Sequence, residues 1–181
     1  MGKYFSKLNN LLFSLISKNE IIITNFYGEN SQFIRFNNSK VRQTGIVDDM
    51  NFSITLLCNN RKCSISMTLT GQENNDRLLL ESYLNKLRDD IKNIPKDPFV
   101  VYPILSKSSK EIYSGNLLDF KTAADYLIPI MNGVDLTGIW ASGRIFSGNA
   151  NSLGLEHWFE TETFSLDYSL ITPNKKMVKA C

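Results

Sequence analysis

The sequence predicts an α+β fold: a helix, an antiparallel β-meander and a second helix, followed by a smaller unit of one helix and a long β-hairpin. Two observations predict it. Apolar residues recur with the three-and-four spacing of amphipathic helices in three separate segments, 3–17, 72–93 and 119–131. Short runs that alternate apolar and polar residues lie between and after these segments, separated by Asn, Gly and Asp turns. Helices packed against one face of an antiparallel sheet define the α+β class.

The composition is that of an ordinary folded protein. The chain has 181 residues, of which 43% are hydrophobic and 21% charged, so one large domain or two small ones can bury a core. The net charge is only +2, because 20 basic residues are mixed with 18 acidic ones. No basic run is long enough to follow a phosphate backbone, which makes nucleic-acid binding an unfavoured function.

The sequence also predicts a cytoplasmic protein with reduced thiols. No apolar run reaches the roughly 18 residues that cross a bilayer, and the apolar stretch 11–16 is too short and too interrupted for a signal peptide. Three cysteines, an odd number, agree with a reducing compartment. A turn at Asn60-Arg61 would place Cys58 opposite Cys63. A disulfide or half of a metal site there is the less favoured alternative, because tetrahedral zinc needs a second pair of ligands.

The first predicted domain covers residues 1–94. Its opening helix, 3–17, is expected to pack on a sheet, and the helix 72–93 is expected to cover the buried face of that sheet. Turn-forming residues at 28–30, 37–39, 47–49 and 59–60 separate the predicted strands. These strands are 21–27, 32–36, 41–46, 51–58 and 62–70.

A linker at 95–118 and the start of a middle domain at 119–181 complete the prediction. Prolines keep the linker extended. The helix 119–131 is followed by a hairpin with strands 138–146 and 155–170, joined by a polar tip at 147–152. One more strand begins at Met177. Because this strand stops at Cys181 without a polar tail, we expect the sequence to be the front part of a longer protein.

Catalytic groups are scarce in this sequence. His157 is the one histidine, so a zinc helix with two histidines one turn apart is excluded. Successive strand residues point to opposite faces, so His157 is expected to point away from Glu156, Glu160 and Glu162. No G-x-S-x-G elbow, P-loop or dinucleotide fingerprint occurs. We therefore assign no catalytic residue and no metal ligand.

Two segments carry a family resemblance. The first is FIRFNNSKVRQ at 33–43, and the second combines Ala141-Ser142-Gly143 with Asn149-Ala150-Asn151-Ser152-Leu153-Gly154-Leu155 and the strand after it. Together with the helix, meander and helix order, they resemble the N-terminal and middle regions of the TldD/PmbA family. The PmbA-type members of that family are also called modulators of DNA gyrase.

The resemblance implies a cytoplasmic zinc metallopeptidase system that acts on unfolded peptides and joins two related subunits. In the family's TldD-type subunit, zinc is held by an H-E-x-x-x-H helix and a later cysteine in the C-terminal part, and PmbA-type subunits lack this motif. No residue of this chain matches it. The resemblance thus implies no cofactor here, with zinc in the C-terminal part of a TldD-type parent, and it leaves open whether this chain is an enzyme.

Five residues of the two motifs are predicted to contact a peptide or a partner subunit: Arg35, Asn38, Arg42, Asn149 and Asn151. The alternative is that the asparagines satisfy their own turns. Three functions stay open. The chain is a peptide-holding part of a metallopeptidase subunit, a non-catalytic module that regulates a partner such as DNA gyrase, or a hydrolase built on His157.

Overall fold

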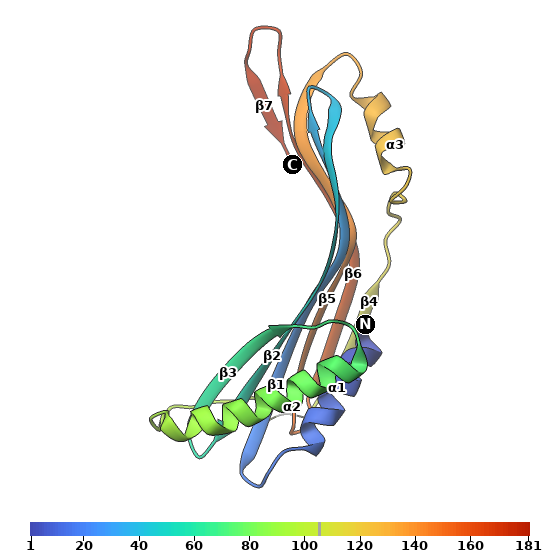
Figure 1. The fold of residues 1–181 in the computed structure, drawn as a ribbon. Coiled ribbons are helices and arrows are strands. Elements are labelled where there is room, and N and C mark those ends of the chain that lie inside the picture. Colours follow the sequence, from blue (N-terminus) through green and yellow to red (C-terminus); the bar gives the residue numbers. More distant parts are fainter. Residues whose placement is uncertain (105) are drawn as a thin grey trace. The chain divides into compact units, whose positions relative to one another are not determined.

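The computed structural model describes residues 1–104 and 106–181 (Figure 1). Within these residues, three α-helices, a short 3-10 helix and an antiparallel sheet of seven strands follow one another in the predicted helix and strand order. The α+β class is therefore confirmed. The elements are α1 (Gly2–Ser14), β1 (Glu20–Asn37), β2 (Lys40–Cys58), β3 (Arg61–Thr68), α2 (Glu73–Asp90), η1 (Ile91–Asn93), β4 (Ser108–Tyr113), α3 (Ala123–Ile130), β5 (Asp135–Asn151), β6 (Glu156–Ile171) and β7 (Met177–Ala180).

The sheet has the strand order β3-β2-β1-β5-β6-β4, and β7 pairs with β6. Strands β2 and β3 form an antiparallel hairpin in which Leu56 lies opposite Cys63 and Cys58 opposite Arg61. Strands β6 and β7 are also antiparallel, from the pair Tyr168 and Ala180 to the pair Ile171 and Met177.

The chain divides into two compact units. Unit 1 consists of residues 1–28, 49–112 and 146–160, and unit 2 of residues 29–48, 113–145 and 161–181. Strands β1, β2, β5 and β6 each contribute residues to both units. The domain boundaries predicted from the sequence, 1–94, 95–118 and 119–181, stay a prediction, and β4 lies within the segment predicted as a linker.

In unit 1, helices α1 and α2 lie beside each other over one face of the sheet (Figure 1). Phe5 lies on the buried side of α1, and its ring contacts the rings of Phe26, Phe52 and Trp158 at centroid distances of 5.6 to 6.2 Å. The rings of Phe26 and Trp158 also contact each other, at 5.5 Å. Aromatic rings bury large apolar areas and favour such tilted contacts. Leucines and isoleucines of α1, α2, β1 and β2 complete this core.

One carboxylate stabilises the turn that leads into α2. Asp76 is fully buried and accepts hydrogen bonds from the backbone N–H of Thr70 (2.8 Å) and of Gly71 (2.9 Å), and from the hydroxyls of Thr70 and Tyr4. Burial alone would raise the pKa of Asp76, but these hydrogen bonds to the charged form lower it. The Tyr4 bond also ties α1 to the beginning of α2.

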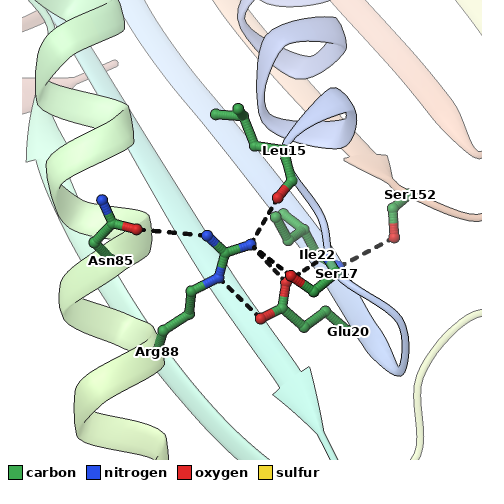
Figure 2. Close-up of polar contacts among 7 residues, drawn as sticks. All are labelled: Leu15, Ser17, Glu20, Ile22, Asn85, Arg88 and Ser152. Carbon is green, nitrogen blue, oxygen red and sulfur yellow. Dashed lines mark hydrogen bonds and ion pairs between the residues drawn. The ribbon is translucent and has the colours of Figure 1, made fainter.

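Figure 2 shows a second connection between these helices. Arg88 of α2 reaches the end of α1 at Leu15 and the start of β1 at Glu20. Nearby, Ser152 and Ile22 exchange hydrogen bonds of 2.9 and 3.1 Å, so the turn after β5 is fixed to β1.

In unit 2, α3 packs against one face of the sheet. Six residues form this second core: Ile34, Phe36, Ala123, Met131, Leu136 and Trp140. Because the strand residues of this core have even numbers, the odd-numbered residues of β1 and β5 point to the opposite face. Among the described residues of unit 2, no helix covers that opposite face.

Three predictions about turns are wrong. Strands β1 and β2 run without interruption through 28–30 and 47–49, where turns were expected. The tip of the long hairpin is at 152–155 and not at 147–152, because β5 continues to Asn151. The turn predicted at 59–60 is confirmed, because Asn59 and Asn60 join β2 to β3 with φ angles of 50° and 61°, in the left-handed region that asparagine tolerates.

The position of the β2–β3 turn determines which residues lie opposite Cys58 and Cys63. Compared with a turn at Asn60-Arg61, it shifts the pairing by two residues, so Cys63 lies opposite Leu56 and not opposite Cys58. Cys58, Cys63 and Cys181 are free thiols. Burial raises the pKa of the Cys63 thiol. Among the described residues, none of the helices is both long and apolar enough to cross a membrane.

Candidate functional site

The sequence-predicted contact residues fall into both units. Arg35, Asn38 and Arg42 belong to unit 2, whereas Asn149 and Asn151 belong to unit 1. Unit 2 also contains the uncovered sheet face, and two depressions lie on it.

A depression of about 560 Å³ crosses four neighbouring strands of unit 2. It unites the arginines of the first motif with residues of the long hairpin. Its lining residues are Arg35, Phe36, Arg42, Gln43, Thr137, Gly138, Ile139, Asp167 and Ser169. The structure therefore brings Arg35 and Arg42 into one concave surface, together with Gln43, which sequence reasoning had not selected.

A second depression, of about 270 Å³, follows the first along β1, β5 and β6. Ile139 lines the first and Ala141 the second, and these two residues share a face of β5. The second depression is lined by Glu29, Ser31, Ala141, Ser142, Gly143, Ile145, Thr163, Phe164 and Ser165. We call the two depressions together the open-face groove.

The floor of the groove depends on two glycines of β5. A Cβ atom on Gly143 would lie 2.4 Å from the carbonyl oxygen of Asn30 and from the Cα of Ser31. A Cβ atom on Gly138 would lie 2.4 Å from the carbonyl oxygen of Asp167. Since only glycine permits backbones to approach this closely, the second motif, Ala141-Ser142-Gly143, forms a low floor between the walls of the groove.

Arg35 is held in place inside the groove. Its guanidinium carbon lies 5.4 Å from the centroid of the Phe33 ring, and its Nη1 donates a hydrogen bond to Oε1 of Gln43 at 3.1 Å. In the described part of the chain, neither Arg35 nor Arg42 forms an ion pair with a carboxylate. Asp167 is instead paired with Lys179, with 3.1 Å between Nζ and Oδ2.

Asn38 has a local structural role. It and Ser39 occupy the left-handed region, with φ angles of 50° and 54°, and form the turn between β1 and β2. The Ser39 backbone N–H donates to the Leu136 carbonyl oxygen at 2.9 Å, which fixes the turn to the start of β5.

The asparagines of the second motif are also engaged within unit 1. Asn151 is only 2% exposed, its Oδ1 accepts from the N–H groups of Leu153 (2.9 Å) and Leu155 (3.0 Å), and its Nδ2 donates to the Pro103 carbonyl oxygen (3.0 Å). Asn149 donates to Oδ1 of Asn25 at 2.6 Å. These bonds correspond to the alternative in which the asparagines hold the chain's own structure, while their contact with a peptide or partner stays a prediction.

His157 lies in unit 1, where its Nδ1 is 2.7 Å from the Ser109 hydroxyl in a small pocket of about 140 Å³. The three neighbouring carboxylates in the sequence are engaged elsewhere. Glu156 accepts from Ser6, Glu160 from the Trp158 indole, and Glu162 from Arg144 and Gly115. The hydrogen bond from Arg144 is the main reason that the pKa of Glu162 is lowered. Among the described residues, no group of three or more His, Cys, Asp and Glu side chains could hold a metal ion.

Sequence reasoning missed Glu29 and Gln43 as residues of the groove, and Phe33 as the ring that supports Arg35. A usable signal was present in the alternation from Glu29 to Arg35, where every second residue reaches one face. The turn predicted at 28–30 placed Glu29 outside a strand, so the alternation was not assigned to one strand face.

Comparison with known proteins supports the fold. No family model matches the sequence, and no curated protein matches it. A candidate modulator of a DNA gyrase from Thermotoga maritima is similar in structure, with a TM-score of 0.66 and 16% identity over 97% of this chain and 41% of that one. A candidate modulator of DNA gyrase from Bacteroides thetaiotaomicron has a TM-score of 0.59 and 15% identity over 98% of this chain and 42% of that one. TldE from Thermococcus kodakarensis has a TM-score of 0.61 and 10% identity over 98% of this chain and 40% of that one.

These likenesses define the class of fold. The chain has the fold shared by TldE and the two candidate gyrase modulators, which confirms at the level of the fold the resemblance to the TldD/PmbA family. It spans about two fifths of the length of each of the three chains. At 10 to 16% identity the fold is what the comparison establishes, and roles of individual residues have to come from this chain itself.

Proposed function

We propose that this chain is the N-terminal and middle portion of a TldD/PmbA-type metallopeptidase subunit and that it holds unfolded peptide in the open-face groove. The proposal is supported by the groove itself, because it lies on the uncovered face of a sheet and contains residues of both motifs. It is also supported by the fold shared with TldE.

The course and the lining of the groove suit an extended peptide. It runs along strands β1, β5 and β6, and its lining includes apolar residues, such as Ile139 and Ile145, and hydroxyls, such as Ser31 and Ser165. A groove of this kind offers apolar contact to side chains and hydrogen-bonding groups to a peptide backbone. We infer that the chain contributes binding and not bond cleavage.

In this proposal, zinc belongs to other parts of a complete complex. The chain would join a related TldD/PmbA-type subunit, and the metal would be held by a TldD-type C-terminal part. The location of that complex in the cytoplasm is part of the same prediction.

Peptide binding can be measured with the chain itself. A fluorescein-labelled unstructured peptide is titrated with the protein, and its anisotropy reports the bound fraction. Ser165 is exposed and lines the groove, so Ser165→Trp fills the groove with an indole and should weaken binding at least tenfold, about 1.4 kcal/mol.

The matched control is Ser66→Trp. Ser66 is also an exposed strand serine, but it belongs to unit 1 and lies outside the groove. Equal loss of binding in both variants, or no binding by the unmodified chain, would refute the proposal. Circular dichroism spectra of both variants establish that they are folded.

A second candidate function is a non-catalytic module that regulates a partner such as DNA gyrase. The observation that favours it is that two of the similar structures are described as candidate gyrase modulators. Co-precipitation of purified gyrase by the purified chain, together with a change in its supercoiling rate, would support this function over the first. Unchanged supercoiling and no co-precipitation would exclude it.

A further inference from the structure

We propose that the open-face groove selects peptides by charge, binding a carboxylate of an extended peptide at Arg35 and a basic side chain at Glu29. This inference rests on the proposed function, because it names the class of peptide that the same groove takes. It is carried by the positions and partners of the charged side chains in unit 2.

The guanidinium of Arg35 has free N–H donors with which to bind an anion. It has five N–H donors, of which one donates to Gln43, and the Phe33 ring supports it from one side. Because Phe33 and Gln43 already restrict the side chain, a carboxylate that binds it does so at a reduced cost in side-chain entropy. Arg42 lines the same depression and adds a second positive charge.

The acid that could compete for Arg35 already has a cation beside it. Asp167 lines the depression, but its carboxylate pairs with Lys179 of β7. The described residues that line this end therefore carry a net positive charge, which is complementary to a carboxylate on the ligand.

Glu29 gives the other end of the groove the opposite charge. Its carboxylate accepts a hydrogen bond from Ser31, and no cation of the described residues forms an ion pair with it. Glu29 and Arg35 lie on the same strand and the same face, six residues apart. At about 3.3 Å per residue, their Cα atoms are roughly 20 Å apart.

This spacing fits an extended peptide better than a small anion. An extended peptide advances by the same distance per residue, so an acidic and a basic side chain about six positions apart would reach both ends of the groove. Among the described lining residues, those between the two charged ends are uncharged, and Ile139, Ala141 and Ile145 line the groove along this length. A free phosphate would satisfy the Arg35 end alone.

The test uses anisotropy titrations of the full chain with three labelled peptides of one length. One carries Glu and Lys six positions apart, one has Gln in place of Glu, and one has Gln in place of Lys. We expect the first to bind on the order of tenfold more tightly than either of the others. Arg35→Gln should abolish the preference for Glu and leave the preference for Lys, and Glu29→Gln should do the reverse.

The control variant is Lys62→Gln, which removes an exposed strand cation from unit 1 and should change neither preference. Equal affinity for the three peptides would overturn the charge selection and leave the proposed function standing, whereas no binding of any peptide would overturn both. Displacement of the first peptide by millimolar inorganic phosphate, but not by acetate at equal ionic strength, would overturn the assignment of the Arg35 end to a carboxylate.

Discussion

Arg88 and Glu20 form a bidentate ion pair in which Nε lies 2.9 Å from Oε1 and Nη2 lies 2.7 Å from Oε2 (Figure 2). Their side chains are 28% and 10% exposed, and Arg88 also donates to the Leu15 carbonyl oxygen. One guanidinium thus joins α2, the end of α1 and the start of β1. Because a parallel pair of charged hydrogen bonds fixes geometry as well as distance, this contact sets how the two helices are placed on the sheet of unit 1.

Replacing Arg88 by Met should destabilise the protein by about 1–3 kcal/mol, because the largely buried Glu20 carboxylate loses its charged partner. Urea unfolding measures this loss. The control is Lys86→Met, whose ion pair with Asp90 lies on the same helix with side chains that are 58% and 50% exposed. That pair should contribute about 0–1 kcal/mol. Equal effects in both variants would contradict the role assigned to Arg88.

Stability should fall in acid. The hydrogen bond from Arg88 is the main cause that lowers the pKa of Glu20, and the bonds from Tyr4 and Thr70 outweigh the effect of burial and lower the pKa of Asp76. A carboxyl group with a lowered pKa in the folded state stabilises the protein at pH values above its unfolded pKa of about 4. That contribution is lost as the pH falls through the folded pKa.

The measurement compares urea unfolding at neutral pH with unfolding at about pH 3. We expect Asp76→Asn to be less stable than the unmodified protein at neutral pH and to show a smaller further loss in acid, since its carboxyl group no longer titrates. An unchanged acid dependence in this variant would show that Asp76 does not contribute to it.

The long helices and the α+β class could be predicted because their signals are local and repeated. Five apolar positions between Phe5 and Ile16, and six between Leu79 and Ile91, recur at helical spacing. The continuity of β1 and β2 could not be predicted in this way. Gly28 is a turn signal in the sequence, but here a Cβ atom would lie 2.9 Å from the Phe26 ring, so the glycine serves close packing within a strand.

The candidate site was predictable only in part, for a related reason. The two arginines were selected, but a groove is formed by residues that share a face across several strands, and this depends on register. Glu29 and Ser165 are far apart in the sequence and reach one surface only because β1, β5 and β6 are neighbours in the sheet. A single sequence does not state that order.

Gly143→Ala tests the close approach of β1 and β5. The new Cβ would overlap backbone atoms of Asn30 and Ser31, which cannot move aside as a flexible side chain would, so we expect a loss of about 1–3 kcal/mol in unfolding free energy. Gly115→Ala is the control, since its Cβ would meet its nearest atom, the Glu162 carbonyl oxygen, at 3.3 Å. Calorimetric unfolding of the two variants should separate them, and a stable Gly143→Ala protein would refute the steric argument.

Asn151→Ala distinguishes a structural from a binding role for the second motif. Removing the amide leaves the N–H groups of Leu153 and Leu155 and the carbonyl oxygen of Pro103 without the partner that they share. Buried groups left without a hydrogen bond cost about 1–3 kcal/mol each, so we expect a loss of about 2–4 kcal/mol in unfolding free energy. Asn149→Ala breaks the more exposed bond to Asn25 and should cost about 1 kcal/mol or less.

If the motif holds the chain's own turn, the folded Asn151→Ala protein should retain the peptide affinity measured by anisotropy. A protein of normal stability that has lost this affinity would instead make Asn151 a contact residue and would move the binding surface toward unit 1.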